Sequence, residues 1–219
     1  METVARELLP YRDVIGNIAG ILTVAQFLSG CFTCNEIRKK GSSEGFSPMQ
    51  FVLGCGLTAL QLKYSQMLAS AVLIRTSAYG LSICIVYSGC FLWFTPSDRR
   101  RPFFTLASKV FLLTSATIYY AGVEDPLKVK DRFGLLITVL TLAYIALPLT
   151  KLGEVVRQKS SAGLPLPVIL TTTCASVLWL LYGIILNNYF IIIQKVVALG
   201  LCFLQLSLFV IYPAKTKRE

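Results

Sequence analysis

The amino-acid sequence predicts an all-α membrane protein whose seven transmembrane helices form two parallel three-helix bundles, joined by an inversion linker helix in a 3+1+3 order. Three observations support this fold class. The composition is 55% hydrophobic and 15% charged, whereas soluble domains carry about a quarter charged residues. Seven apolar runs approach the length of about 20 residues that a bilayer-crossing helix needs. The two halves of the sequence also repeat each other at a fixed offset.

The apolar runs are separated by short polar connections, so nearly the whole chain is expected to lie in or near the bilayer. Asp and Glu are absent from the apolar interiors of these runs. The predicted spans cover residues of about 14–35, 46–66, 70–94, 103–122, 131–152, 164–186 and 189–212.

A shift of 118 residues aligns the two halves without a gap. Asp13 then meets Asp131, and the segment SSEG at 42–45 meets SSAG at 160–163. Apolar helices share leucines by chance, but they do not share charged and glycine landmarks at one offset. The pattern therefore indicates an internal repeat.

Each repeat contains three spans, and an odd number of spans reverses the orientation of the chain across the membrane. The fourth span has no counterpart in the repeat and restores the parallel sense of the two halves, with a pseudo-two-fold axis along the membrane normal. We therefore predict a first three-helix repeat at 11–94, a linker containing the fourth span at 95–129, a second three-helix repeat at 130–213 and a cytoplasmic tail at 214–219.

Lysine and arginine are unevenly distributed between the two sets of connections. Twelve lie after spans one, three and five and in the C-terminal tail, and five lie on the opposite side. Because cytoplasmic loops carry the excess of basic residues, the N-terminus is predicted outside and the C-terminus in the cytoplasm. The net charge of +10 has the same origin, so no nucleic-acid partner is expected.

Seven cysteines fall inside the apolar runs, where a cysteine packs as a small hydrophobic residue. The CFTC segment at 31–34 has C-x-x-C spacing, but the sequence holds no histidine and no second such pair. A zinc site or a redox pair is therefore not expected. No metal, cofactor or enzymatic activity is predicted.

Four segments resemble the SWEET family of sugar transporters, and the resemblance extends from Tyr11 to Pro213. They are KKGSSEGFSP after span one, RQKSSAGLPLP after span five, LWLLYG at 178–183 and FVIYP at 209–213. Each segment alone is a weak signal, but together they are specific. The resemblance implies a passive, bidirectional sugar carrier that holds its substrate midway between two three-helix bundles.

The resemblance also implies four substrate-binding positions, paired by the 118-residue offset. The aromatic plates of the family, usually tryptophan in spans two and six, map to Gln61 and Trp179. Its two substrate-binding asparagines, in spans three and seven, map to Ser77 and Lys195. Only Trp179 is the expected residue. The family's glycine in span two is also replaced, by Ser65.

Hinge positions of the family show similar departures. Pro148 and Pro167 match expected prolines, and Gly30 lies opposite Pro148 in the repeat. In span two, Pro48 is present, but Gln50 stands where similar proteins carry a second proline. A proline within a membrane helix frees a backbone carbonyl and permits a swivel. We expect these five positions to act as hinges.

Each candidate residue also has a purely structural interpretation. Trp179 would then fill a helix interface, and Gln61 would make a hydrogen bond between helices. The hydroxyl of Ser77 is expected to bond to carbonyls of its own helix. Arg75, which lies inside span three, is expected to extend back to the extracellular interface.

Lys195 lies about 9 Å inside span seven at 1.5 Å per residue. A charge facing lipid at such a depth costs about 2.5–3.5 kcal/mol, and reaching the interface requires nearly two helical turns. Because Lys195 is the repeat partner of Ser77, it is predicted to point into a water-filled cavity. An ammonium donates hydrogen bonds to sugar hydroxyls but, unlike asparagine, does not accept them.

The predicted function is passive transport of mono- or disaccharides such as glucose by alternating access, with sugar and the lipid bilayer as partners. Downhill flux needs no coupled ion, which agrees with spans whose apolar interiors lack Asp and Glu. One alternative is a SWEET-like subunit or regulatory partner that no longer carries sugar. Another is a carrier of small anions with Lys195 as counter-ion. The plasma membrane is the predicted location, the Golgi is the alternative, and any homo-oligomer is additional to the fused repeats.

Overall fold

The computed structural model describes residues 2–146, 153, 157, 159 and 166–212. These residues contain helices and connecting turns but no β-strand. The chain forms two compact units. The middle unit comprises Thr23–Ile137, and the terminal unit comprises Met1–Leu22 together with Thr138–Glu219.

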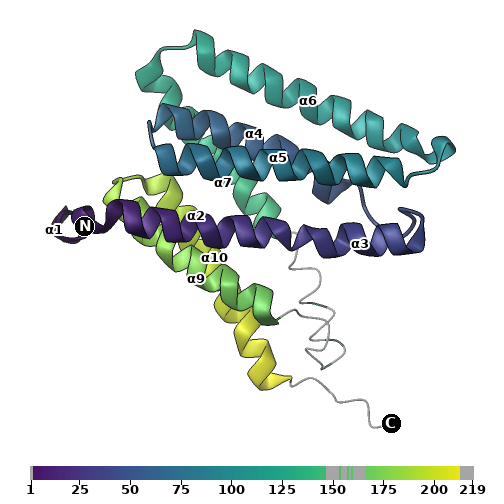
Figure 1. Cartoon of the computed structure of the whole chain (residues 1–219). Helices are drawn as coiled ribbons and strands as arrows, with labels where there is room; N and C mark the ends of the chain where they lie inside the picture. The colour runs from purple at the N-terminus through teal and green to yellow at the C-terminus, as the bar shows by residue number, and fades with distance from the viewer. Residues whose placement is uncertain (1, 147–152, 154–156, 158, 160–165, 213–219) are drawn as a thin grey trace. The chain divides into compact units, whose positions relative to one another are not determined.

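The middle unit is built around a helical hairpin of α4 and α5, with α6 packed along α4 and α3 in contact with α5 (Figure 1). Its helices are α3 (Gly30–Lys40), α4 (Met49–Met67), α5 (Ala71–Trp93), the short 3-10 helix η2 (Ser97–Arg99) and α6 (Arg100–Val123), together with the end of α2 (Arg12–Leu28) and most of the described part of α7 (Pro126–Ala146).

The terminal unit is built around a second hairpin, formed by α9 (Leu166–Ile185) and α10 (Tyr189–Ile211). The short helix α1 (Glu2–Leu8) contacts α9, and the 3-10 helix η1 (Leu9–Tyr11) leads from α1 into α2.

Five helical stretches among the described residues are long and apolar enough to cross a membrane. Two of the predicted spans correspond to helices that miss this threshold. α4 carries Gln61, Lys63 and Gln66 in its last two turns, and α7 begins with a charged segment at 128–132. The five stretches are Thr3–Lys40, Ala71–Trp93, Ser97–Val123, Leu166–Ile185 and Tyr189–Ile211.

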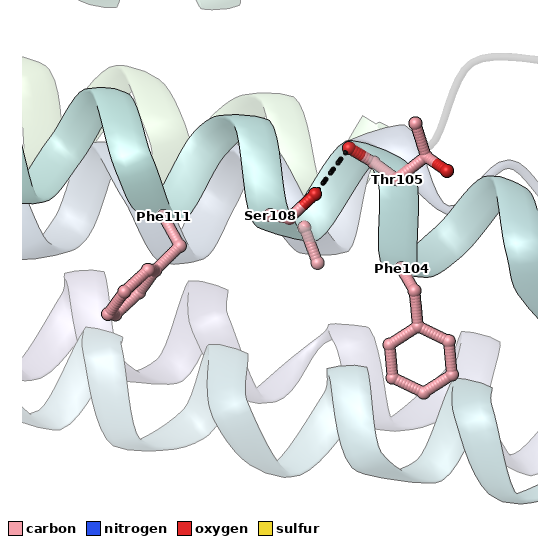
Figure 2. Close-up of a pocket in the computed structure, with 5 residues that line it drawn as sticks. Phe104, Thr105, Ser108 and Phe111 are labelled. Carbon is pink, nitrogen blue, oxygen red and sulfur yellow. Dashed lines mark hydrogen bonds between the residues drawn. The ribbon is translucent and has the colours of Figure 1, made fainter.

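α6 corresponds to the predicted linker span, and one of its faces is apolar and open. Figure 2 shows Phe104 and Phe111 projecting from the same side of this helix, with Thr105 and Ser108 between them along the chain. They line a depression of about 630 Å³ whose lining residues all come from α6. The Ser108 hydroxyl donates to the Thr105 carbonyl at 3.1 Å. Because Phe104 and Phe111 are exposed and the Ser108 hydroxyl is bonded within the helix, this face is suited to lipid rather than to a sugar.

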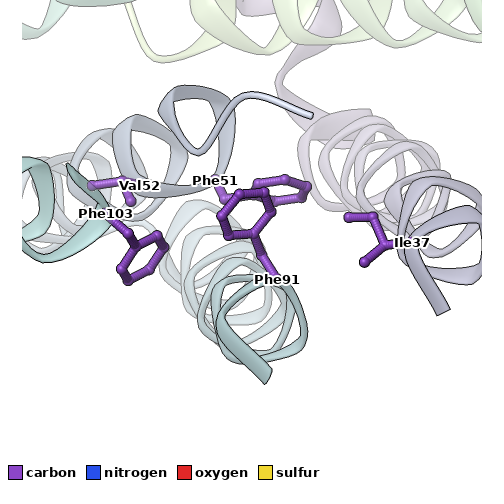
Figure 3. Packing of buried hydrophobic residues seen from close by; sticks show 5 residues of the cluster. All are labelled: Ile37, Phe51, Val52, Phe91 and Phe103. Carbon is purple, nitrogen blue, oxygen red and sulfur yellow. The ribbon is translucent and has the colours of Figure 1, made fainter. Parts of the chain in front are cut away.

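The core of the middle unit joins four helices near one end of the hairpin. Ile37 of α3, Phe51 and Val52 of α4, Phe91 of α5 and Phe103 of α6 form this buried cluster (Figure 3). The ring centroids of Phe51 and Phe91 are 5.4 Å apart, and those of Phe91 and Phe103 are 5.8 Å apart. Aromatic pairs at such distances add to the burial of apolar surface, so the cluster fixes α6 against the hairpin.

The loop at 41–48 is held against the end of α5 by polar contacts. The amide of Ser43 donates to the Phe94 carbonyl at 3.1 Å, and its hydroxyl lies 2.8 Å from that of Thr95. The guanidinium of Arg99 pairs with the carboxylate of Glu44. Arg99 lowers the pKa of Glu44 below its ordinary value, mainly through its hydrogen bond to the carboxylate and secondly through its positive charge.

Loss of the Glu44 charge is expected to loosen this loop. A lowered pKa means that the ion pair contributes at neutral pH and is lost as pH falls through the pKa of folded Glu44. Hydrogen exchange in 41–47 should therefore increase a few-fold on acidification beyond the intrinsic change, and Glu44→Gln should give a similar increase at neutral pH. Glu36→Gln is the control because Glu36 has no ion pair among the described residues. Unchanged exchange in Glu44→Gln would contradict the prediction.

The turns of the two hairpins have the same backbone at positions 118 residues apart. The amide of Ser70 bonds to the Ser65 carbonyl at 3.4 Å, and that of Asn188 bonds to the Gly183 carbonyl at 3.0 Å. The residue before each amide is left-handed, with φ of 49° in Ala69 and 50° in Asn187. This is the Schellman pattern of a helix end. The repeat found in the sequence is therefore also a repeat of local structure.

Side-chain caps then start the second helix of each hairpin. The Ser70 hydroxyl accepts from the amide of Leu73 at 3.4 Å, and the Asn188 side chain accepts from the amide of Ile191 at 3.0 Å. Each bond satisfies one of the first amides of a helix, which have no partner within the helix itself. The pairing of serine with asparagine shows that either side chain supports this turn.

Ala69→Gly is expected to stabilise the folded protein by about 1 kcal/mol. A left-handed backbone costs alanine about 1–2 kcal/mol because its Cβ crowds the following carbonyl, and glycine removes that cost but gains unfolded-chain entropy. Asn187→Gly is the matched control, with a smaller gain expected because asparagine tolerates this conformation. Thermal unfolding in detergent tests both variants. An equal or smaller gain for Ala69→Gly would contradict the strain argument.

Candidate functional site

In the middle unit, Ser65, Ser77 and the backbone of Gln61 form one hydrogen-bonded chain between α4 and α5. The Ser65 hydroxyl donates to the Gln61 carbonyl at 2.7 Å and lies 3.2 Å from the Ser77 hydroxyl. Both serines are buried, and the Gln61 side chain is half-buried. The structure therefore brings two predicted site residues together and joins them through Ser65.

The expectation that Ser77 bonds to carbonyls of its own helix is wrong. The hydroxyl of Ser77 pairs instead with Ser65 across the hairpin. Nearby side chains on α5 do follow the expected pattern, since Thr76 donates to the Val72 carbonyl at 2.9 Å. Arg75 turns back to the Ala71 carbonyl at 3.3 Å, so its guanidinium extends toward the first turn of α5.

In the terminal unit, the predicted aromatic plate Trp179 is buried, with 6% of its surface exposed. Its ring meets that of Tyr182 edge to face, with centroids 5.5 Å apart and an interplanar angle of 86°. Tyr182 is completely buried. An edge-to-face pair fixes the orientation of the indole, so Trp179 is held in one position rather than left free to rotate.

Lys195 lies on α10, the partner of α9 in the terminal hairpin, and its side chain is half-buried. Among the described residues its ammonium makes no hydrogen bond and no ion pair. The residue before it, Gln194, is buried and donates to the Thr138 hydroxyl of α7 at 3.0 Å. The two neighbouring polar residues therefore differ, because Gln194 links helices and the Lys195 ammonium has no partner among the described residues.

The first predicted span is interrupted beside Gly30, one of the positions expected to act as a hinge. α2 ends at Leu28 and α3 begins at Gly30. The Ser29 hydroxyl donates to the Gln26 carbonyl at 2.6 Å, and the Tyr87 hydroxyl donates to the Phe27 carbonyl at 2.9 Å. Because hydroxyls compete with amides for these carbonyls, the helix is interrupted beside Gly30.

Gly30 is required at this break by the close approach of Tyr87. A Cβ at position 30 would lie 2.4 Å from Cε2 of the Tyr87 ring, a distance at which the ring must move. The hydroxyl of Tyr87 also lies 3.1 Å from the sulfur of Cys31. Tyr87 therefore fixes the break from α5, and it is a residue that the sequence analysis missed.

The other predicted hinge positions lie at helix starts or outside the described residues. Pro48 precedes α4, and its carbonyl accepts the first helical bond, from Val52 at 3.1 Å. Proline there does not interrupt a helix, since the first amides have no helical partner. Gln50 is the second residue of α4 and is exposed. Pro167 lies in the first described turn of α9, and Pro148 lies outside the described residues.

The whole chain was compared with known proteins. A family model described as "Sugar efflux transporter for intercellular exchange" matches residues 13–99 and 131–217, two segments separated by the same 118-residue offset. A protein of Drosophila pseudoobscura pseudoobscura named Sugar transporter SWEET1 is 32% identical over 220 residues, which cover 99% of this chain and 93% of the relative. The chain belongs to the SWEET family. The resemblance found in the sequence is confirmed.

Other SWEET proteins match over most of their length. The Bidirectional sugar transporter N3 of Medicago truncatula is 29% identical, with 90% of this chain and 75% of the relative covered. The structure of a eukaryotic SWEET transporter at 3.7 Å resolution matches with a TM-score of 0.83 and 24% identity, covering 93% of this chain and 97% of that one. This likeness confirms the predicted fold class.

Membership of the SWEET family also confirms two coarser predictions. The apolar helices and the family match show a multi-pass membrane protein. The family is one of transporters and not of enzymes.

Proposed function

We propose that this protein is a passive, bidirectional transporter of mono- or disaccharides such as glucose. The observation that carries the proposal is the match of the family model to both halves of the chain, together with relatives named sugar transporters over nearly its full length. A partial match would leave one repeat unaccounted for, whereas here both repeats are present. The domain boundaries 11–94, 95–129, 130–213 and 214–219 belong to this proposal.

Gln61, Ser77, Trp179 and Lys195 are the proposed substrate-binding residues. A sugar offers hydroxyls that donate and accept hydrogen bonds, and apolar C–H faces that stack on an aromatic ring. The side chain of Gln61 supplies an amide, Trp179 an indole with a fixed orientation and Lys195 three donors. These groups provide both kinds of contact that a sugar needs.

Transport proceeds by alternating access, in which the substrate-binding residues are open to one side of the membrane at a time. The break beside Gly30 supports a hinge in the first span, because helix bonds are already interrupted there. Gly30, Pro48, Gln50, Pro148 and Pro167 are the proposed hinge positions. The sugar favours neither state, so it moves down its own gradient without an ion.

The protein is proposed to reside in the plasma membrane, with the Golgi or another endomembrane as the alternative. The N-terminus is proposed outside and the C-terminus in the cytoplasm, from the distribution of basic residues. Any homo-oligomer would be additional to the two repeats, which are already fused in one chain.

Lys195 favours one alternative substrate class. Its ammonium has no hydrogen bond or ion pair among the described residues, and an unpaired charge inside a membrane protein is typical of a counter-ion for a ligand. A carrier of small organic anions would use it in that way. The replacements at 61, 65, 77 and 195 favour a second alternative, a SWEET-like subunit that no longer carries sugar.

Uptake of radiolabelled glucose in a transporter-deficient cell tests the proposal. We expect saturable uptake and efflux that do not depend on sodium or on a pH gradient. Uptake at background in cells where the protein is present at the surface would overturn sugar transport. Competition of binding by a small organic acid, but not by glucose, would identify the anion carrier instead, and binding of neither would support the regulatory subunit.

A further inference from the structure

The hydrogen bonds of Ser65 have a fixed direction. A serine hydroxyl carries one proton. The Gln61 carbonyl carries none, so the 2.7 Å contact between them uses the proton of Ser65. The 3.2 Å contact between Ser65 and Ser77 must then use the other proton, that of Ser77. Ser65 accepts, and Ser77 donates.

This series of hydrogen bonds leaves the Ser77 hydroxyl able only to accept a further hydrogen bond. Its only proton is directed to Ser65, so its oxygen offers lone pairs but no donor to any further group. Without Ser65, the proton of Ser77 would be free to rotate toward a ligand. The residue at position 65 therefore sets the hydrogen-bonding character of the residue at position 77.

The corresponding positions in the terminal unit have the opposite character. Gly183 takes the place of Ser65, and Lys195 takes the place of Ser77. A glycine has no hydroxyl, and a Cβ at position 183 would lie 2.9 Å from Cγ2 of Ile191, so a serine is not accommodated there without a shift. An ammonium donates and does not accept. One repeat thus presents an acceptor and the other a donor.

We propose that Ser65 is a specificity-determining residue that makes Ser77 accept a hydrogen bond from one hydroxyl of the bound sugar. Ser65 acts through Ser77 and is a positioning residue. The proposal rests on the proposed sugar transport, and it adds that the substrate must donate a hydrogen bond at this contact. A ligand group that only accepts is excluded there, because two lone pairs would then face each other.

Fluorinated and deoxygenated sugars test this directly, because fluorine accepts weakly and does not donate, whereas hydrogen does neither. The probes are the monodeoxy and monofluoro forms of glucose, used to displace labelled glucose from purified full-length protein. At the ring position that contacts Ser77, the fluoro form should bind the wild-type protein no more tightly than the deoxy form, because fluorine brings a lone pair against that of Ser77. In Ser65→Ala, the affinity of the fluoro form should rise about three- to tenfold relative to that of the deoxy form. A neutral hydrogen bond contributes about that factor.

Ser82→Ala is the matched control, because Ser82 lies on α5 and donates to its own Ala78 carbonyl at 3.0 Å. Ser82→Ala should keep the wild-type ratio of fluoro-form to deoxy-form affinity at every ring position. Ser65→Gly removes the same hydroxyl and serves if Ser65→Ala does not fold, and Ser65→Thr should retain the wild-type pattern. If the fluoro-to-deoxy ratio is unchanged at every ring position, the role of Ser65 is overturned while sugar binding stands. If the wild-type protein does not bind glucose at all, both proposals are overturned.

Discussion

Trp179→Gln is expected to lower glucose uptake at least about tenfold. The substitution gives α9 the residue that α4 carries at the equivalent position, Gln61, and leaves the protein with no aromatic plate at either. Loss of stacking on one sugar face is expected to cost about 1.4 kcal/mol or more, which corresponds to a factor of ten. Uptake of labelled glucose, normalised to surface protein, is the measurement.

Trp93→Gln is the matched control for this prediction. Trp93 is the other tryptophan of the chain, and it ends α5 with 80% of its surface exposed. Its replacement should leave uptake within about twofold of the wild type, as is usual for an exposed residue. Equal effects of the two substitutions would show that Trp179 has no special role in transport.

Burial of Trp179 makes a second variant necessary. Removing a large core side chain costs about 3–5 kcal/mol of stability, so loss of uptake in Trp179→Gln would have two explanations. Trp179→Phe keeps an aromatic face and much of the packing against Tyr182. We expect it to retain most uptake. Loss of uptake in Trp179→Phe, with normal thermal unfolding in detergent, would contradict the stacking role.

Gly30→Ala is expected to destabilise the protein by about 1–3 kcal/mol and to slow transport. The added methyl would lie 2.4 Å from the Tyr87 ring, and overpacking of this kind forces side chains and backbone to shift. Movement of the ring would also lengthen the hydrogen bond from Tyr87 to the Phe27 carbonyl. Thermal unfolding in detergent and the rate of glucose exchange measure the two effects.

Gly89→Ala provides the control on α5, since a Cβ at position 89 meets nothing within 4 Å. It should be neutral or slightly stabilising, because alanine is the better helix former. Tyr87→Phe removes only the hydroxyl and is expected to cost about 1–3 kcal/mol by leaving the Phe27 carbonyl unpaired. In the double variant the two losses should not add, since both act on one contact. Full additivity would contradict the proposed coupling of Gly30 to Tyr87.

The fold was largely predictable because its determinants are regular in sequence. The apolar runs predict the spans. The 118-residue offset predicts that the hairpin turns around Ala69 and Asn187 are equivalent. The break at Ser29 was not predictable in this way. It depends on Tyr87, which lies about 60 residues further along the chain, and no local pattern specifies which carbonyl a distant hydroxyl will reach.

The positions of the candidate site are predicted from the family resemblance and the repeat, whereas its hydrogen bonds are seen only in the structure. Trp179 and Lys195 follow from resemblance and repeat symmetry, whereas the partner of Ser77 depends on the register between α4 and α5. One signal was available, because Ser65 and Ser77 both replace the residues that the family pattern leads one to expect. Two departures on adjacent helices indicate compensation, but only the second contact of Ser65, with the Gln61 carbonyl, indicates which hydroxyl donates.

The matching turns at 69 and 187 carry a consequence for how the two repeats have diverged. Their backbone angles agree, although Ala69, Ser70 and Leu73 differ from Asn187, Asn188 and Ile191 in every side chain. The conformation of the turn is thus determined by its main-chain hydrogen bonds, and most of its side chains can vary without changing it. Duplicated segments of this kind drift apart in sequence while staying superimposable in shape, which leaves the substrate-contacting residues of each repeat free to specialise separately.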